Sequence, residues 1–321
     1  MFAMNPKQGL LFLNEATLRD LIDPSELLQE LTKGFMALCR GEISVPDRTK
    51  LSVSEKDLLL CMPACQPDAR IAVKMVTIFP GNANLVSPTH HALICLFNPS
   101  SGAPICVMDG TYITALRTAL AAILSVRLLA TKSSRVAVVI GSGVQAREHV
   151  RLLSLARDFE ELLVWSRNHE NAFRLAEELP SARAVLDLET NVSVADVVCL
   201  CTSSQTPIIQ SEWMKPGAHI TSVGFAPPGG ELPRGLTHQL LFVETRQAFK
   251  PPPVGCSELA DIDPQNAAEL GEVLLGLRPG RSSSSEITVY KAMGFAMEDL
   301  VAANLAYRCA LLNGHGEYVS W

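Results

Sequence analysis

The chain has 321 residues, of which 48% are hydrophobic and 19% charged, so it is long enough for about two globular domains with sizeable cores. Its net charge of −6 argues against a nucleic-acid or acidic-membrane binder, because either needs a basic face. The nine cysteines show no metal-ligand spacing, no apolar run reaches the roughly 18 residues of a membrane span, and no signal-peptide pattern opens the sequence. We therefore expect a soluble cytoplasmic protein without a metal site.

The first third of the sequence predicts a mixed region of helices and strands. Residues 10–13 have the pattern of a short strand, and 14–42 that of two helices, the second opened by Pro24 at its first position. From about 50 to 108 four strand patterns follow one another, and the hairpin-type turn NPSSGAP joins the last two. A long helix pattern at 112–131 comes next. We expect a largely antiparallel sheet in this region.

From residue 135 to about 245 the pattern changes, and strands alternate with helices. This rhythm is typical of βαβ units and predicts an α/β fold with a doubly wound parallel sheet covered on both faces. Residues 285–312 then predict a strand and a long helix. We expect this last helix to pack back onto the N-terminal region.

The segment RVAVVIGSGVQAREHV, residues 135–150, has the pattern of a dinucleotide-binding turn. A strand leads to Gly141, which permits a tight turn, while Gly143 lets backbone amides approach a pyrophosphate and the small Ala146 allows close packing of helix and strand. The helix that follows directs its N-terminal dipole at the phosphate charge. The alternative interpretation is a tight strand–helix turn without a ligand.

The end of the next strand, about 20 residues further on, bears on the choice of nucleotide. An acidic residue there holds the ribose of NAD, whereas this chain has Ser166, Arg167 and Asn168. Arginine suits a 2′-phosphate, so NADP(H) is preferred over NAD(H), unless Arg167 is simply a solvated loop charge. The segment 202–207 is expected to border the nicotinamide. The predicted cofactor-binding residues are Gly141, Gly143, Val144, Gln145, Ala146, Ser166, Arg167, Asn168, Thr202 and Ser203.

Five stretches together resemble the ornithine cyclodeaminase/mu-crystallin family: VMDGTYITALRTALAAILSVRLLA, VIGSGVQAREH, WMKPGAHITSVG, AELGEVLLGLRPGR and VYKAMGFAMEDLVAANLAY. The resemblance implies a Rossmann-type domain plus a split α+β substrate domain that also makes a homodimer. On this basis residues 1–125 form the first part of the substrate and dimerisation domain, 126–285 the Rossmann domain, and 286–321 a segment that returns to the substrate domain.

The resemblance also implies a site for a small amino-acid or imine substrate. Arg48, Lys74 and Arg117 match the family positions that hold the substrate carboxylate, and a guanidinium with a second cation suits that group chemically. Lys74 stands in an apolar strand, where an ammonium is costly to bury unless it is used or paired. The alternatives are a surface charge for Arg48, a strand lysine that reaches solvent for Lys74, and a helix-face salt bridge for Arg117.

Other polar residues leave a functional and a structural interpretation open. His91, or its neighbour His90, either lines the substrate pocket or is structural. Asp109 and Thr114 are expected to orient the turn and cap the helix that follows rather than to do chemistry. The further family positions with both interpretations open are Lys291, Glu298 and Asp299.

One loop departs from the pattern of the cyclodeaminases. They place an aspartate where this chain, in VGFAPPGGELP, has Ala226, and no carboxylate follows until Glu231. Cyclodeamination of ornithine needs a base and an ion partner for the second amine, so the loss favours a reductase. The implied reaction is the NAD(P)H-dependent reduction of a ketimine carboxylate of the 1-pyrroline-2-carboxylate or 1-piperideine-2-carboxylate type.

In this reading Lys74, Arg48 and Arg117 are the catalytic residues, and either Lys74 supplies the imine proton through a water or the iminium itself binds. The predicted substrate-binding residues are Arg48, Lys74, Arg117, His91 and Ala226. Three alternative functions stay open. They are an ornithine cyclodeaminase that uses NAD catalytically, an oxidoreductase like alanine dehydrogenase, and a non-catalytic binder like mu-crystallin.

Overall fold

The computed structural model describes residues 9–67, 69–85 and 87–320, which form two compact units with one sheet each. The first unit comprises Met1–Arg117 and Phe295–Trp321, and the second comprises Thr118–Gly294. The domain boundaries predicted from the sequence, after residues 125 and 285, lie within ten residues of these.

The first unit is built on a seven-stranded sheet with the order β15-β1-β6-β5-β4-β3-β2. β1 and β6 are parallel and all other neighbours are antiparallel, as expected from the sequence. Its strands are β1 Leu10–Leu13, β2 Thr49–Ser52, β3 Leu58–Gln66, β4 Arg70–Ile78, β5 His90–Phe97, β6 Pro104–Asp109 and β15 Glu317–Val319. Its helices are α1 Glu15–Leu21, α2 Pro24–Cys39 and α9 Ala296–Asn313, and α3 Gly110–Leu129 begins in this unit.

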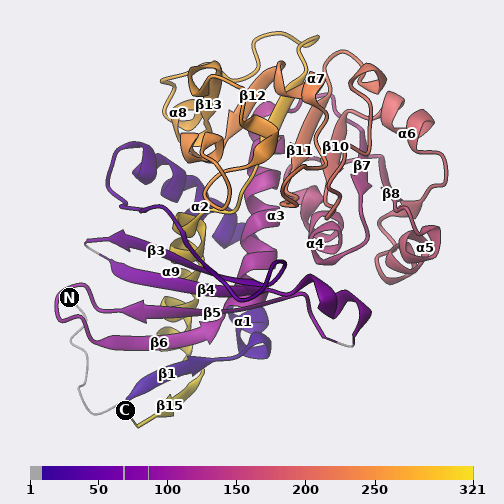
Figure 1. Cartoon of the computed structure of the whole chain (residues 1–321). Coiled ribbons are helices and arrows are strands. Elements are labelled where there is room, and N and C mark those ends of the chain that lie inside the picture. Colours follow the sequence, from indigo (N-terminus) through magenta and orange to yellow (C-terminus); the bar gives the residue numbers. More distant parts are fainter. Residues whose placement is uncertain (1–8, 68, 86, 321) are drawn as a thin grey trace. The chain divides into compact units, whose positions relative to one another are not determined.

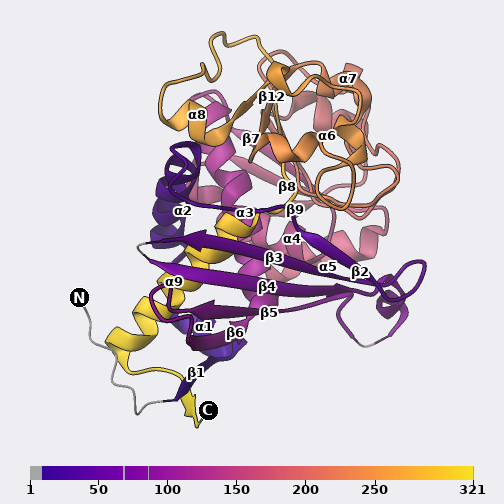
Figure 2. The same ribbon diagram turned by 60° about the vertical axis from the view of Figure 1, so that its left-hand side comes forward.

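The last long helix, α9, lies across one face of this sheet, as Figures 1 and 2 both show. Burial alternates along the strands, so that Ala72, Lys74 and Val76 of β4 are buried on the same face. α2 packs on α9, and a Cβ at Gly34 would lie 2.7 Å from the sulfur of Met297, so glycine lets the helices approach closely. The prediction that this helix returns to the N-terminal region is confirmed.

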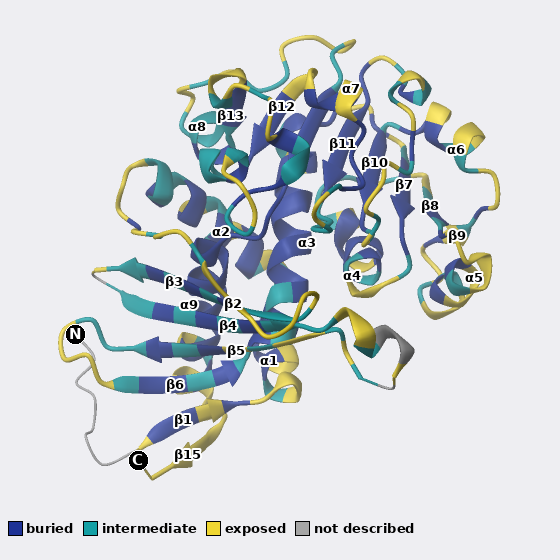
Figure 3. Ribbon diagram, viewed as in Figure 1, coloured by how far each residue is buried: buried dark blue, intermediate teal, exposed yellow. Residues whose placement is uncertain are grey.

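The opposite face of the same sheet is less covered. The alternate residues of β3 and β4 are apolar but only half-buried, which Figure 3 shows as teal segments between dark blue ones. They include Leu59, Cys61, Ile71, Val73 and Met75.

The second unit is built on an eight-stranded sheet, all parallel, in the order β13-β12-β14-β11-β10-β7-β8-β9. β8 and β9 are added on one side of β7, and β10 and the later strands are added on its other side, so the strand order reverses between β7 and β10. Such a switch point is where open α/β sheets bind ligands, and the doubly wound Rossmann-type prediction is confirmed. Its strands are β7 Val136–Ile140, β8 Glu161–Trp165, β9 Arg183–Ala184, β10 Val197–Leu200, β11 His219–Ser222, β12 Leu240–Val243, β13 Ala267–Glu269 and β14 Thr288–Lys291. Its helices are α4 Val144–Leu152, α5 His169–Glu178, α6 Leu188–Val194, α7 Arg234–Thr237 and α8 Leu270–Leu274.

Two expectations differ from the structure. Residues 286–294, predicted to go with the C-terminal segment, supply β14, which is inserted between β11 and β12 of the parallel sheet. α3, in turn, has a window of mean hydropathy 1.5 and is long enough to cross a membrane, contrary to the expectation that no segment is. Since 83% of that window is buried inside the protein, packing accounts for its apolar composition.

Candidate functional site

The predicted dinucleotide turn forms at the carboxyl end of β7. Gly141 has a φ of +130°, and a Cβ there would lie 2.3 Å from the carbonyl oxygen of Cys201, so only glycine fits. α4 begins at Val144 with Gly143 as its N-cap, and Ala146 is fully buried beneath the turn. The N-terminus of α4 therefore lies at the switch point of the sheet, which is the position that suits a pyrophosphate.

Gly143 separates a ligand-binding turn from a merely tight one. It is exposed, its φ of −83° is open to any residue, and a Cβ built on it meets no atom within 4 Å. The protein itself therefore does not require glycine at this position, whereas close approach of a phosphate does. The residues of the turn fit a dinucleotide.

We expect Gly143→Ala to fold normally and to bind NADPH about tenfold more weakly, because its Cβ enters the space of the pyrophosphate. The dissociation constant is measurable by quenching of protein fluorescence, and the thermal midpoint checks the fold. Gly141→Ala serves as the contrast, since it strains the backbone and lowers stability. Wild-type affinity in Gly143→Ala would favour the turn without a ligand.

The end of β8 lies beside the turn. Ser142 Oγ and Ser166 Oγ are 3.0 Å apart, and Asn168 caps α5 by accepting a hydrogen bond from the backbone N–H of Glu170 at 3.1 Å. Arg167 stands between these two anchored residues. It is exposed, and its side chain has no hydrogen bond or ion pair with another described residue. Of the three residues predicted at this strand end, Arg167 is the one with a side chain available to a ligand.

Glu231 fastens two loops at the carboxyl edge of the parallel sheet. Its Oε2 accepts hydrogen bonds from the backbone N–H and the hydroxyl of Thr202, both at 2.7 Å. Its Oε1 accepts from Ser222 Oγ at 3.0 Å and from the backbone N–H of Gly224 at 2.7 Å. Because the carboxylate is buried and used in this way, it holds the Thr202 loop in place and does not replace the aspartate missing at Ala226.

Lys291 reinforces the same edge. Its buried ammonium lies 2.7 Å from Glu258 Oε2 and donates to Ser222 Oγ at 3.0 Å and to the carbonyl of Gly224 at 2.8 Å. Burial opposes the charge, but the Glu258 carboxylate together with Cys256 and Glu231 outweighs it, so the pKa of Lys291 is raised. All three N–H groups have protein partners, which supports the structural interpretation of Lys291.

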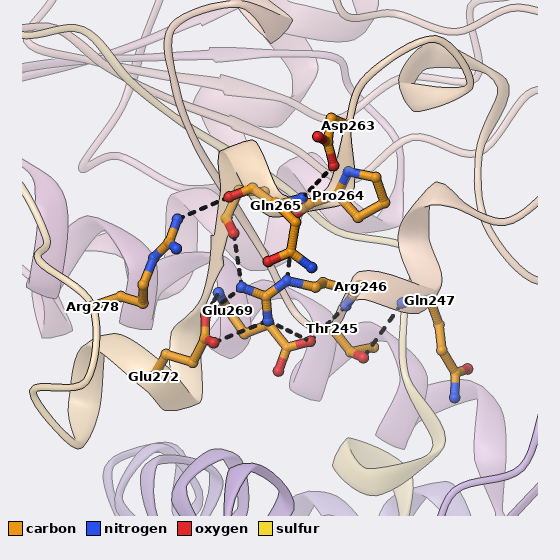
Figure 4. Close-up of polar contacts among 10 residues, drawn as sticks. Thr245, Arg246, Gln247, Asp263, Pro264, Gln265, Glu269, Glu272 and Arg278 are labelled. Carbon is orange, nitrogen blue, oxygen red and sulfur yellow. Dashed lines mark hydrogen bonds and ion pairs between the residues drawn. The ribbon is translucent and has the colours of Figure 1, made fainter.

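The family stretch AELGEVLLGLRPGR is explained by Arg246 (Figure 4). Its guanidinium donates to both carboxylate oxygens of Glu272, at 3.0 and 2.9 Å, and to the carbonyls of Ala267 and Pro264 at 3.1 and 3.2 Å. Glu269 and Glu272 also form the capping box that begins α8. This stretch therefore has a structural role in the second unit.

In the first unit, the structure joins two of the predicted cations to two carboxylates. Asp299 Oδ2 lies 2.7 Å from Lys74 Nζ, and Asp299 Oδ1 accepts from Arg117 Nε at 2.9 Å. Glu298 Oε2 accepts from Arg117 Nη1 at 2.7 Å. Each of the four side chains is at most 2% exposed. We call these residues the buried ion cluster. Its two positive and two negative charges balance.

Lys74 is the unusual member of the cluster. Burial, followed by the positive charge of Arg117 and then of Arg48, outweighs the attraction of Asp299 and lowers its pKa from 10.5 to about 8. The influence of Arg48 places all three predicted cations in one electrostatic neighbourhood. Lys74 also donates to Thr114 Oγ1 at 3.3 Å, and its third N–H has no partner among the described residues.

The remaining predicted residues of this unit fall into place by register. β4 and β5 pair Lys74 with Ile94, so His90, and not His91, shares the sheet face of Lys74. Desolvation by the surrounding protein and then the positive charge of Lys74 lower the pKa of His90, although part of its side chain reaches solvent. Asp109 caps α3 as expected, accepting from the backbone N–H of Tyr112 at 2.7 Å. The expected capping role of Thr114 is replaced by its contact with Lys74.

Ala226 lies half-buried in the loop after β11, in the second unit. Gln205 Nε2 donates to the carbonyl of Pro227 at 3.2 Å and holds this loop.

Sequence reasoning left the roles of Glu231 and of the Glu298–Asp299 pair open. For the pair, the signal was present, because acidic residues within the first turn of an apolar helix need a buried partner.

Comparisons with known proteins agree with this architecture. Ketimine reductase mu-crystallin from Mus musculus is 35% identical over 313 residues, which is 94% of this chain and 97% of the relative. A structure of Thermococcus litoralis Delta(1)-pyrroline-2-carboxylate reductase in complex with NADH and L-proline matches with a TM-score of 0.91 and 32% identity, over 97% of this chain and 100% of that one. An archaeal alanine dehydrogenase dimer with bound NAD matches with a TM-score of 0.90 and 29% identity, over 97% and 99%. The family model that matches residues 11–313 confirms the resemblance seen in the sequence: the chain belongs to the ornithine cyclodeaminase/mu-crystallin family.

Proposed function

We propose that the protein is an NAD(P)H-dependent reductase that acts on C=N bonds and converts a small ketimine carboxylate, such as 1-pyrroline-2-carboxylate or 1-piperideine-2-carboxylate, to the amino acid. The buried ion cluster carries this proposal, because it sets a lysine with a lowered pKa beside a guanidinium. A carboxylate and an imine nitrogen are the two groups that such a pair recognises. The relatives named ketimine reductase and pyrroline-2-carboxylate reductase support the same reaction class.

Reduction of a ketimine adds a hydride to the imine carbon and a proton to its nitrogen. When bound, the nicotinamide would supply the hydride. Arg48 and Arg117 hold the substrate carboxylate by charge-assisted hydrogen bonds. The Lys74 ammonium donates its proton to the imine nitrogen and is left as a neutral amine, which regains a proton from water. A pKa of about 8, rather than 10.5, makes that ammonium a better acid near neutral pH.

We propose NADP(H) as the preferred nucleotide, supported by the guanidinium of Arg167 at the end of β8, which has no partner among the described residues. Arg167→Ala is expected to weaken NADPH binding about tenfold and to leave NADH binding unchanged, since only the former carries a 2′-phosphate. Dissociation constants for both nucleotides test this. An equal loss of affinity for NADPH and NADH, or no loss for either, would show that Arg167 does not recognise the 2′-phosphate.

The competing activities make different demands. A cyclodeaminase has to manage a second amine, but the loop at Ala226 offers no carboxylate, and the neighbouring Glu231 and Glu258 already hold protein groups. An oxidoreductase of linear substrates, of the alanine dehydrogenase kind, could use the same three cations. The choice between these functions therefore rests on the substrate.

The test is to follow the absorbance of NADPH, and in parallel of NADH, with the purified protein and each of three substrates: 1-pyrroline-2-carboxylate, 1-piperideine-2-carboxylate, and pyruvate with ammonia. Release of ammonia from ornithine is measured alongside. We expect oxidation of NADPH with a cyclic ketimine and no ammonia from ornithine. Turnover with pyruvate and ammonia but with neither ketimine would favour an oxidoreductase of the alanine dehydrogenase kind. Proline formation from ornithine would favour a cyclodeaminase.

We also propose that the protein is a homodimer in a reducing compartment such as the cytoplasm. The half-buried apolar face of the first unit's sheet supports an interface with a second copy, and the nine cysteines are all free. Light scattering tests the dimer, with an expected mass of twice 34.7 kDa. A monomer at micromolar concentration would contradict it.

A further inference from the structure

Asp299 is the only member of the buried ion cluster that contacts both cations. One carboxylate oxygen lies 2.7 Å from Lys74 Nζ and the other accepts from Arg117 Nε at 2.9 Å. The three residues come from β4, α3 and α9, so the carboxylate joins three elements that are distant in sequence. We propose that Asp299 is a positioning residue, which fixes the Lys74 ammonium relative to the Arg117 guanidinium and supplies the negative charge that keeps this ammonium protonated.

The neighbouring carboxylate of Glu298 does not share this role. Glu298 Oε2 contacts Arg117 Nη1 at 2.7 Å, so Arg117 keeps an acidic partner when Asp299 is neutralised. Lys74 has no other acidic partner among the described residues, because its remaining hydrogen bond goes to the hydroxyl of Thr114. The protonation of Lys74 therefore depends on Asp299, whereas Arg117 retains the Glu298 carboxylate when Asp299 is neutralised.

The titratable groups coupled to Lys74 come from four other segments. Arg117 of α3 and Arg48 ahead of β2 lower its pKa, Asp299 of α9 opposes them, and Lys74 in turn lowers the pKa of His90 of β5. Burial and the two arginines favour the neutral amine, whereas Asp299 favours the ammonium. Removal of the Asp299 charge should therefore make Lys74 lose its proton at lower pH.

This inference rests on the proposed function, in which the ammonium donates a proton. Asp299→Asn keeps the shape and removes the charge, and Glu298→Gln is the matched control, since it removes an equally buried charge from the adjacent residue. For Asp299→Asn we expect the alkaline limb of the kcat profile to move down by about one to three pH units. KM should stay within a few-fold of wild type, because Arg117 keeps Glu298. Glu298→Gln should leave that limb in place. Equal shifts in the two variants would overturn the proposal.

A second measurement does not require turnover. In protein labelled with ¹³C at the lysine ε-carbons, the Lys74 resonance is identified by its loss in Lys74→Met, and its titration is compared in wild type and Asp299→Asn. An unchanged titration overturns the inference even if the enzyme reduces ketimines. A shifted titration supports it even if none of the tested ketimines is a substrate, in which case the proposed function alone fails.

Asp299→Glu separates charge from position and serves if Asp299→Asn does not fold. It keeps the charge but cannot place both oxygens as before, so we expect a near wild-type alkaline limb and a kcat lowered about tenfold or more. Wild-type kcat in this variant would remove the positioning role. Hydrogen exchange in peptides from β4 and α9 verifies the fold of the first unit in each variant, and nucleotide binding verifies that of the second.

Discussion

Lys74→Met is expected to lower kcat for ketimine reduction by about 100- to 10,000-fold, the range that a positioned general acid contributes. Methionine has a similar length and keeps the packing of β4, but it carries no proton to donate. The residues of the glycine turn belong to the second unit, so the dissociation constant for NADPH should not change. Stopped-flow single turnovers with saturating nucleotide measure the chemical step directly.

Lys33→Met provides the matched control. Lys33 lies on α2 of the same unit, but it is exposed and, within the described part of the chain, pairs only with Glu30 of its own helix. This change should leave kcat unaffected, since exposed pairs contribute little. Wild-type turnover in Lys74→Met would show that the imine arrives already protonated and that Lys74 only binds.

The pH profile of the wild type follows from the same residue. In the proposed mechanism the reductive direction needs the ammonium form of Lys74, so its rate should fall as the pH rises through about 8. Oxidation of the product amino acid needs the neutral amine, so its rate should rise over the same interval. A reductive limb that does not fall, or an oxidative limb that does not rise, with a midpoint near this pH would contradict the assignment.

Arg117→Met is expected to lower the stability of the first unit by about 3–5 kcal/mol, because it leaves buried carboxylates without compensation. The cluster would hold one positive and two negative charges, and Glu298 would lose the guanidinium that lies 2.7 Å away. Trp165 and Trp213 belong to the second unit, so their fluorescence would not report this change. Hydrogen exchange in peptides from β4 and α9 measures it where it occurs.

A double variant identifies the cause. Arg117→Met with Glu298→Gln removes the uncompensated charge and should recover part of the lost protection, whereas simple loss of packing would not be recovered. Lys33→Met is the surface control in the same unit. Its ammonium is exposed, and its pair with Glu30 should contribute at most about 1 kcal/mol.

The features that the sequence predicted well are local. The strand, glycine turn and helix around Gly141 follow one another within 16 residues, so their spacing alone predicts the geometry. Lys74 stood out for a similar reason, since an ammonium in an apolar strand needs a partner. The alternation of strands and helices predicted the parallel sheet of the second unit.

What the sequence could not predict depends on which distant segments meet. The partners Arg117 and Asp299 are 182 residues apart, and the insertion of β14 between β11 and β12 is decided by strand pairing that no local pattern encodes. The choice between His90 and His91 depends on a single step of register between β4 and β5. Family resemblance named Glu298 and Asp299 as well as the cations, but it left open whether these carboxylates have a structural or a functional role.

The buried ion cluster also has an order of assembly. Lys74 and Arg117 are made early in synthesis, and both carboxylates lie on α9, near the end of the chain. All of the second unit is translated before residue 295, so every strand of its sheet precedes the covering helix of the first unit in synthesis. A nascent chain that stops before residue 295 therefore carries both cations without Glu298 and Asp299. Translation of the last helix is thus the step that neutralises the centre of the first unit.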